Sequence, residues 1–473
     1  MRLVVFEGLE RTPMPIFNEK AVLRLGKGLT ASGRLNESAI EPALRIMVRY
    51  GAVARAMGAE RFEVLATAAV RDATNGPAFA AAVEAKLPGV PLRILTGIEE
   101  AALSAEGVRC GIPEADGVLA DIGGGSLEVA RMGGEGVVQS ASLGLGVIRL
   151  ADRSGGDLLR ARAIAEAELG CVRWLSDGAE RDLYLVGGAF RALARVQMAR
   201  TQYPLSIVHH YTLDRDAALE LATQLVLPRN RAERMAGTSR RRVEDLPMAA
   251  VVLRRLLRRT GAKRVVWSAN GIREGWFMQL LSAEERARDA VLAGAQEIAR
   301  RYGRDIRLPL ALFTWTAALF TGETRAETRL REAACWLSDT GAHDHPEYRA
   351  EQAFLRVLRQ PGVAIDHPAR AFLALTVALR YEAEPDASYL TPARALLSPE
   401  AIRRAEVLGT ALRLAYVLSA GTTALLAGVT LRLSPGRLSL LLAEGTGVFA
   451  GESVQRRMDR LAGALGLVAE PLG

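Results

Sequence analysis

The sequence has few cysteines, few lysines and few aromatic residues. Its 473 residues include only three cysteines, Cys110, Cys171 and Cys335, without the spacing of metal ligands. So sparse and odd a set argues against a disulfide framework and favours a reducing compartment, the cytoplasm. Aromatic residues make up only 5% of the chain, while alanine and leucine are abundant in the second half, so we expect the packing there to be largely helical.

Long apolar runs are also missing. The longest candidate, residues 408–433, is interrupted by Arg413 and Arg432, so the sequence predicts no membrane span. The first residues, Met1–Gly8, leave no room for the apolar region of a signal peptide and instead have the pattern of a strand. We therefore expect a cytoplasmic protein with no membrane partner.

What the chain does contain is a normal globular composition with an excess of arginine. The hydrophobic fraction is 49% and the charged fraction 24%, and the length predicts two to four domains. Lysine and arginine outnumber acids by 61 to 53, which gives a net charge of +8, and only four of these basic residues are lysines. A bias towards arginine in the coding sequence explains the ratio, whereas the net excess favours an anionic partner. A nucleic acid is the less expected choice, because aromatic residues do not interleave with the basic ones.

The hydrophobic pattern changes character near residue 281. Before that point, strand patterns at residues 2–7, 61–66, 92–95 and 117–121 alternate with helical stretches, which is typical of an α/β domain. Two more buried strands are predicted at residues 183–186 and 264–268. After residue 281 strand patterns nearly vanish, so we predict an all-helical domain over residues 282–473.

The most informative motif is the glycine turn in the sequence DIGGGSLEV, residues 121–129. Its three glycines allow the backbone to approach a bulky anion and to point several N–H groups at it, and Ser126 adds a hydroxyl donor. Asp121 and Glu128 flank the turn, and their carboxylates would repel a phosphate unless a cation such as Mg²⁺ lay between them. The alternative is an ordinary hairpin with solvated acids. The glycines are Gly123, Gly124 and Gly125.

Two further strand ends carry candidate groups. Gly187 and Gly188 follow a strand and precede a helix, an arrangement that favours an anion but also occurs in purely structural turns. At the other strand end, Thr96 and Glu99 have the spacing of a capping box, so Glu99 has a structural task. Glu100 points away from it around the helix and is a candidate base for water.

Two arginines that follow strands are candidates for phosphate binding. Arg71 lies in the segment ATAAVRDA and Arg273 in SANGIREG. For both, the alternative is an ion pair with a neighbouring acid.

Taken in order, these segments resemble the exopolyphosphatase/guanosine pentaphosphate phosphohydrolase (Ppx/GppA) family. The matching segments are spread over nearly the whole of the first 280 residues: residues 66–73 with 75–76, 96–101, 121–128, 142–150, 187–194 and 268–275.

The resemblance implies an actin-like fold of two α/β lobes, for which we expect residues 1–117 and 118–281. It also implies release of terminal phosphate from inorganic polyphosphate, with guanosine pentaphosphate as a second substrate and tetraphosphate as its product, and dependence on Mg²⁺. The matching motifs place the general base on Glu100 and metal binding on Asp121 and Glu128. Phosphate contacts fall on the turn 123–126, Gly187, Gly188, Arg71 and Arg273.

The sequence departs from the family pattern at two places. The family's first phosphate motif, of the type Asp-x-Gly-Ser-Asn-Ser, does not precede the strand at residues 2–7, which we expect to reflect a start assigned too late rather than a true truncation. The C-terminal part resembles an HD-like domain, but Ser338 precedes Asp339 where metal-dependent HD enzymes carry histidine. We expect this domain to extend a basic channel through its arginines and to form the contact of a homodimer.

Two other functions remain open at this point. The chain is an impaired binder of polyphosphate or guanosine alarmone if the first motif is truly absent. The second alternative is an ATPase or kinase of the same superfamily.

Overall fold

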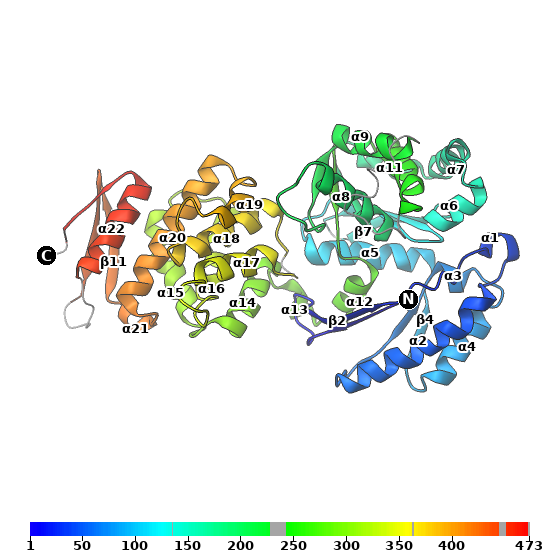
Figure 1. Ribbon diagram of the computed structural model, residues 1–473, viewed down its shortest axis with the longest axis horizontal. Coiled ribbons are helices and arrows are strands. Elements are labelled where there is room, and N and C mark those ends of the chain that lie inside the picture. The colour runs from blue at the N-terminus through cyan, green and yellow to red at the C-terminus, as the bar shows by residue number, and fades with distance from the viewer. Residues whose placement is uncertain (135, 228–242, 362–363, 444–450, 472–473) are drawn as a thin grey trace. The chain divides into compact units, whose positions relative to one another are not determined.

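The computed structural model describes residues 1–134, 136–227, 243–361, 364–443 and 451–471 (Figure 1). The chain divides into two compact units, Met1–Arg286 and Ala287–Gly473. The division lies five residues after the predicted change of character at 281. None of the helices in the described ranges is both long and apolar enough to cross a membrane.

A six-stranded sheet forms the centre of the first unit. Its order is β7-β6-β5-β8-β10-β9, with β5, β8 and β10 parallel and the other neighbours antiparallel. The carboxyl ends of the parallel strands meet at one edge, where ligands collect in α/β sheets. The strands are β5 (Gly117–Ile122), β6 (Leu127–Gly133), β7 (Gly136–Leu143), β8 (Asp182–Val186), β9 (Thr212–Asp214) and β10 (Arg264–Trp267).

Helices cover both faces of this sheet. Buried side chains on one face pack against α6 (Val147–Ser154), α7 (Leu158–Gly170), α8 (Gly188–Arg200), α9 (Arg215–Val226) and α11 (Leu246–Thr260). On the other face Leu119 and Ala130 pack against Ala101, Ala105 and Val108 of α5 (Gly97–Gly111). The helix α12 (Ile272–Leu280) in turn packs on α5.

The N-terminal part of this unit contains two separate strand pairs. The strands β1 (Arg2–Phe6) and β2 (Pro15–Lys20) pair antiparallel, and β3 (Val64–Ala66) and β4 (Leu92–Ile94) pair parallel. A shared apolar core joins both pairs to α2 (Glu37–Ala56) and α4 (Gly76–Lys86). Two short helices, α1 (Leu29–Ser32) and α3 (Ala68–Arg71), complete this part.

The second unit is mainly helical, as predicted, but it also contains a small sheet that corrects the all-helical prediction. The strands β11 (Val429–Ser434) and β12 (Arg437–Leu442) form a hairpin, and β13 (Val468–Ala469) pairs with β12. Its turn residues are Pro435 and Gly436, and Gly436 has φ +75°, as a type II turn requires. The sheet packs with α20 and α22 in one apolar cluster. The sequence did not predict this sheet, because its segments are rich in leucine and therefore favour a helix prediction.

The helices of this unit pack side by side around α18 and α20. They are α14 (Ala290–Tyr302), α15 (Leu308–Trp315), α16 (Arg325–Leu337), α17 (Arg349–Arg359), α18 (His367–Arg380), α19 (Thr391–Arg394), α20 (Pro399–Ser419), α21 (Thr423–Leu426) and α22 (Glu452–Leu465). The short helix α13 (Ala283–Ala287) spans the division between the units, and four of its five residues belong to the first unit.

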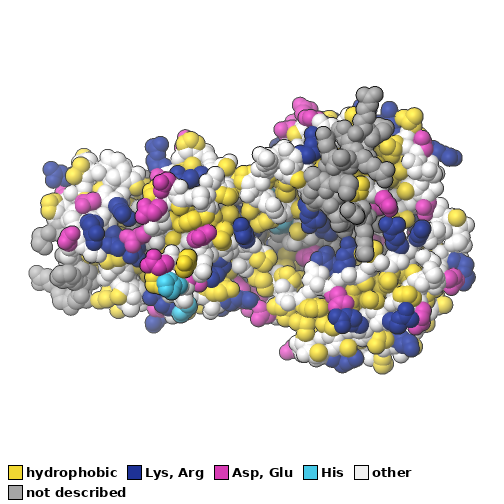
Figure 2. Space-filling model, in the orientation of Figure 1, with side chains coloured by type: hydrophobic (Ala, Val, Ile, Leu, Met, Phe, Trp, Pro, Cys, Tyr) yellow, Lys and Arg dark blue, Asp and Glu magenta, His cyan; other side chains and the backbone are white. Residues whose placement is uncertain are grey.

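Several arginines of the second unit are already paired with acids. Arg331 is buried and donates to Glu323 at 2.9 Å, and Arg356 donates to Asp344 at 3.0 Å. On the face shown in Figure 2, basic side chains lie among acidic ones rather than in one continuous patch. Arg331 therefore does not serve the basic channel that we expected from the sequence.

Candidate active site

Two acidic side chains face each other at the end of the central strand. Asp121 on β5 and Glu128 on β6 are direct partners across the antiparallel pair, so their side chains lie on the same face of the sheet. Both are buried. Like charges at such a position destabilise a sheet, which indicates a task other than stability.

Serine hydroxyls are the hydrogen-bonding neighbours of these two carboxylates. Ser104 Oγ donates to Asp121, and Ser142 Oγ donates to Glu128 Oε1 at 2.8 Å. Among the residues that the structure describes, neither acid forms an ion pair. Burial raises the pKa of Glu128 to about 8, and the nearby charges of Glu100 and Asp121 add to this rise. The pKa of Asp121 is likewise raised, chiefly by burial.

A cation would relieve this repulsion, and the donor set suits Mg²⁺. Magnesium takes oxygen ligands, commonly one or two carboxylates together with phosphate oxygens and water. Across the described ranges, no group of three or more histidine, cysteine or acidic side chains is arranged around a metal position. The pair Asp121 and Glu128 fits the smaller set of protein ligands that a phosphate-bound Mg²⁺ requires.

Hydrogen bonds from the first residues of α6 fix the glycine turn between β5 and β6. The amides of Val147 and Ile148 donate to the carbonyls of Gly123 and Gly124, at 3.1 and 3.0 Å. The Gly123 amide donates to the Ser126 carbonyl, whereas in the described residues the amides of Gly124 and Gly125 donate to no protein group. These two amides are therefore the ones available to an anion.

Glu100 lies in the first turn of α5. Its neighbour Glu99 completes the predicted capping box, accepting from the Thr96 amide at 2.7 Å, while Glu100 itself is buried. Burial raises the pKa of Glu100 to about 7, although the Arg71 guanidinium opposes the rise. A carboxyl group with a pKa near neutrality is suited to accept a proton at physiological pH.

Arg71 holds this carboxylate. Its guanidinium donates to Glu100, to the Leu95 carbonyl at 2.8 Å and to Asp72 at 3.1 Å. Asp72 also accepts from Arg149 of α6 at 2.6 Å. The ion pair that the sequence left as an alternative for Arg71 is thus present, and one of its partners is the candidate base.

Gly187 lies directly against Asp121. Its φ is +100°, and a Cβ atom there would lie 2.2 Å from the Ile122 carbonyl oxygen and 3.1 Å from Asp121 Oδ1. Only glycine fits this position. Gly188 begins α8, so the N-terminus of that helix lies at the same edge of the sheet as Asp121.

Two arginines at the site were not singled out from the sequence. Arg191, one turn into α8, donates to the Ala269 carbonyl at 3.1 Å. Burial lowers its pKa to about 10, against the opposing charge of Asp121. Arg149 lies beside the glycine turn. Arg149 and Arg191 both belong to segments that carry the family resemblance. Their positions on predicted helices did not show that their side chains lie at the site.

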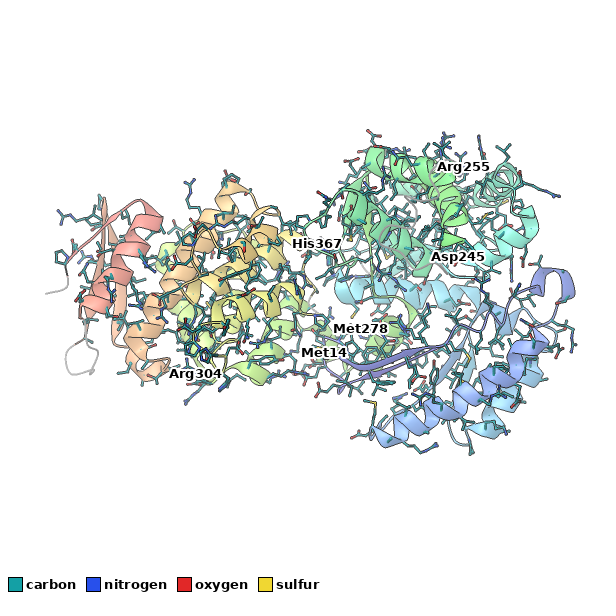
Figure 3. All side chains as sticks on the ribbon, viewed as in Figure 1. Met14, Asp245, Arg255, Met278, Arg304 and His367 are labelled. Atoms are coloured by element: carbon teal, nitrogen blue, oxygen red, sulfur yellow. The ribbon has the colours of Figure 1, made fainter. Side chains whose placement is uncertain are left out.

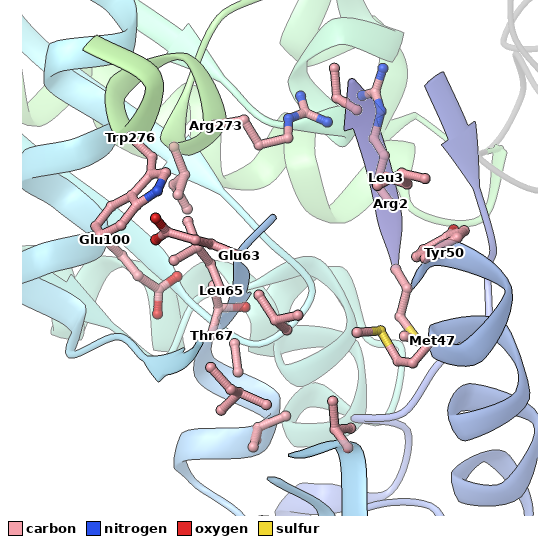
Figure 4. Close-up of a pocket in the computed structure, with 18 of the residues that line it drawn as sticks. Arg2, Leu3, Met47, Tyr50, Glu63, Leu65, Thr67, Glu100, Arg273 and Trp276 are labelled. Atoms are coloured by element: carbon pink, nitrogen blue, oxygen red, sulfur yellow. The ribbon is translucent and has the colours of Figure 1, made fainter. Parts of the chain in front are cut away.

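One cavity of about 1110 Å³ brings most of these groups together (Figure 4). Arg71, Gly187 and Gly188 are not among the residues that line this cavity. Arg71 nevertheless contacts Glu100, and Gly187 lies against Asp121. The site residues along its wall are Glu100, Asp121, Gly123, Gly124, Gly125, Ser126, Glu128, Arg149 and Arg273.

Two family models together match most of the chain. Residues 4–284 match the Ppx/GppA phosphatase family, and residues 291–470 match the exopolyphosphatase C-terminal domain. The chain belongs to the Ppx/GppA phosphatase family. The first unit accordingly has the actin-like fold.

Individual relatives extend the match. The chain is 28% identical to exopolyphosphatase 2 of Mycobacterium tuberculosis over 284 residues, 56% of this chain and 89% of the relative. It is also 28% identical to exopolyphosphatase 1 of that organism, over 58% of this chain and 82% of the relative. Among solved structures, an exopolyphosphatase from Cytophaga hutchinsonii superimposes with a TM-score of 0.51 at 22% identity, covering 56% of this chain and 88% of that one.

Ser338 and Asp339, which we compared with the His-Asp pair of metal-dependent HD enzymes, belong to a network of hydrogen bonds and ion pairs. Ser338 Oγ lies 3.1 Å from the Tyr416 hydroxyl, and Asp339 accepts from Arg304 Nε at 2.9 Å (Figure 3 labels Arg304). His367 is buried at the start of α18. Asp339 thus has an ion-pairing task.

Proposed function

We propose that this Ppx/GppA protein is an exopolyphosphatase, which releases terminal phosphate from inorganic polyphosphate by direct attack of water. One observation carries the proposal: three buried carboxylates, Glu100, Asp121 and Glu128, line the same cavity as a glycine turn with two available amides. A phosphate chain has the complementary chemistry, provided that a cation accompanies it.

In this proposal, different residues of the site bind the phosphate groups and the cation. The amides of Gly124 and Gly125 and the hydroxyl of Ser126 hold oxygens of the terminal phosphate. Asp121 and Glu128 would hold Mg²⁺, which neutralises charge on the phosphate when bound. Arg273, on the cavity wall, and the helix start at Gly188 favour the next phosphate groups along the chain.

Glu100 is the proposed general base. It accepts a proton from the water that attacks the terminal phosphorus, and the water oxygen forms the new P–O bond as the P–O bond to the shortened chain breaks. Arg71 positions Glu100 and keeps part of it ionised. Because phosphoryl transfer depends mainly on positioning and charge neutralisation, no covalent nucleophile is needed.

The same site suits the terminal phosphate of guanosine pentaphosphate, which we include as a second substrate with tetraphosphate as product. A homodimer and a cytoplasmic location are further parts of this proposal. They rest on the family membership and the sequence rather than on the site.

The impaired binder remains a second candidate, because the strands of the N-terminal part form two separate pairs. Phosphate release from long-chain polyphosphate and from guanosine pentaphosphate, measured side by side with Mg²⁺, distinguishes the candidates. Release from polyphosphate is the expected result. Tight binding of polyphosphate without release of phosphate would favour the binder and contradict the enzyme.

A further inference from the structure

Arg149 lies where the glycine turn meets the ion pairs that hold the candidate base. It belongs to the first turn of α6, and its amide donates to the Gly124 carbonyl at 3.1 Å. Its guanidinium lies against Gly125, because a Cβ atom on that glycine would be 3.6 Å from Arg149 Nη2. The side chain also lines the active-site cavity. The guanidinium is therefore next to one of the two amides that are available to an anion.

Asp72 is the acid with which Arg149 pairs. Arg149 Nη2 donates to Asp72 Oδ2 at 2.6 Å. Within the part of the chain that the structure describes, Arg149 Nε and Nη1 donate to no protein group. The Arg149 side chain is 22% exposed. Arg149 thus has donors to spare at the wall of the cavity.

Asp72 has a second arginine partner, so it does not depend on Arg149. Its other carboxylate oxygen accepts from Arg71 Nε at 3.1 Å, and Arg71 also donates to Glu100. The Asp72 side chain is 30% exposed. An ion pair that is open to water contributes little to stability, and Asp72 would keep its pair with Arg71 if Arg149 turned away. The pair of Arg149 with Asp72 is therefore easily opened.

We propose that Arg149 is a further substrate-binding residue, which exchanges Asp72 for a phosphate group. While the turn is empty, Asp72 holds the guanidinium. When a phosphate binds to the amides of Gly124 and Gly125, Arg149 donates to the phosphate oxygens and its pair with Asp72 opens. Phosphate is the better partner, because it carries more charge than a carboxylate and accepts two parallel N–H bonds from the planar guanidinium.

The exchange gives Asp72 a task of its own. Asp72 competes with the substrate for Arg149, so the affinity of the turn for phosphate is lower than it would be with a free guanidinium. The proposal rests on the proposed function, which places the terminal phosphate on this turn. It adds a residue to the binding site and a competitor that tunes the strength of binding.

Calorimetric titration of the full chain with inorganic phosphate, at a fixed Mg²⁺ concentration, tests the exchange. Phosphate corresponds to the terminal group and is not hydrolysed, so the titration reports binding alone. The variants are Asp72→Asn, Arg149→Gln and the double variant. Asp152→Asn is the matched control, because Asp152 is an exposed acid of α6 whose side chain has no partner among the described residues.

We expect Asp72→Asn to tighten phosphate binding by about fivefold or more, because Arg149 no longer has to leave a carboxylate. Arg149→Gln should weaken binding by about tenfold, since it removes charge-assisted hydrogen bonds. In the Arg149→Gln background, Asp72→Asn should change the affinity by less than about twofold, because the competition acts through Arg149. Asp152→Asn should bind phosphate like the wild type.

Two results would overturn the exchange. If Asp72→Asn weakens phosphate binding or leaves it unchanged, Asp72 does not compete for Arg149. If Asp72→Asn tightens binding equally with and without Arg149, the loss of a negative charge explains the effect and Arg149 has no part in it. Should Arg149→Gln fail to fold, Arg149→Lys replaces it, because lysine keeps the charge but lacks the planar pair of donors. The tightening by Asp72→Asn should then again be smaller than in the wild type.

Failure of the exchange differs from failure of the proposed function. A wild-type protein that binds phosphate, shows the expected pattern of variants and releases no phosphate from polyphosphate would support the exchange and contradict the enzyme. Release of phosphate from polyphosphate, together with equal phosphate affinity in all variants, would contradict the exchange alone. A wild-type protein that binds no phosphate would overturn both.

Discussion

Acids that are buried or partly buried have opposite surroundings in the two units. In the second unit, Glu382 lies between Arg413 and Arg457, at 2.6 and 3.1 Å, and Glu323 accepts from Arg331 and Arg404. In the first unit, Asp121 and Glu128 accept hydrogen bonds from serine hydroxyls and form no ion pair in the described part of the chain, although the charges of Arg191 and Arg273 act on Asp121. The difference is visible in the pKa values.

Burial pulls the pKa of Glu382 up, but the charges of Arg413 and Arg457 outweigh it and leave the pKa below its usual value. At Glu128 no cation opposes burial, and the pKa rises to about 8. The comparison indicates that the acids of the second unit stabilise its fold. In the first unit Glu128 has no cationic partner among the described residues, which is costly unless a bound cation and substrate complete the site.

The largest effect should come from the candidate base. Glu100→Gln preserves shape and removes only the proton acceptor, so we expect loss of at least about 10²-fold in the rate of phosphate release. Binding of polyphosphate, measured by titration, should stay nearly unchanged. A rate within a few-fold of the wild type would exclude Glu100 as the base.

The second-largest effect is expected for Asp121→Asn and Glu128→Gln. Each removes one charge from the proposed Mg²⁺ ligands, so we expect the Mg²⁺ concentration for half-maximal rate to rise by about tenfold or more. Glu382→Gln is the control and should leave this concentration unchanged. The same Mg²⁺ dependence in all three variants would place the metal elsewhere.

Stability should respond in opposite directions to pH in the two units. Because the folded-state pKa of Glu128 is raised, the folded state binds more protons than the unfolded state between about pH 4.5 and 8, and stability falls as pH rises through that range. Without Mg²⁺, Glu128→Gln should therefore raise the free energy of unfolding at pH 8 by about 1–3 kcal/mol.

For Glu382 the sign is reversed. Its lowered pKa contributes stability above about pH 4.5 that is lost as pH falls through the folded-state value, so Glu382→Gln should destabilise the protein at pH 7. Urea unfolding at pH 5, 7 and 8 measures both effects. Destabilisation by Glu128→Gln at pH 8 would contradict the comparison.

The smallest effect belongs to the neighbour of the base. Glu99→Gln should weaken the capping box of α5 and lower the free energy of unfolding only slightly. Its rate of phosphate release should match the wild type. A rate loss as large as that of Glu100→Gln would mean that the assignment of the two glutamates is reversed or shared.

Much of the first unit could be predicted from local patterns. The buried strands around residues 119, 184 and 266, the helix 76–86 and the capping box at Thr96 all rest on short-range signals, and the structure confirms them. The strand β2 was missed because Asn18, Glu19 and Lys20 give it a polar, half-exposed surface.

The site could be predicted only in part. Asp121 and Glu128 flank a recognisable turn, so the sequence itself brings them together. Arg149 and Arg191 reach the site only through the packing of α6 and α8. The separation of the pair β1–β2 from the pair β3–β4 depends on contacts between residues that are far apart in the chain. No local pattern contains that information.

The most direct test of the account is an NMR titration of individual glutamate carboxyl groups. The protein carries ¹³C-labelled glutamate and is measured without Mg²⁺. The variants Glu100→Gln, Glu128→Gln and Glu382→Gln assign the three signals. The account predicts that Glu128 titrates near pH 8 and Glu100 near pH 7, while Glu382 titrates below the usual glutamate value. Titration of Glu100 and Glu128 together with Glu382 in the acidic range would contradict it.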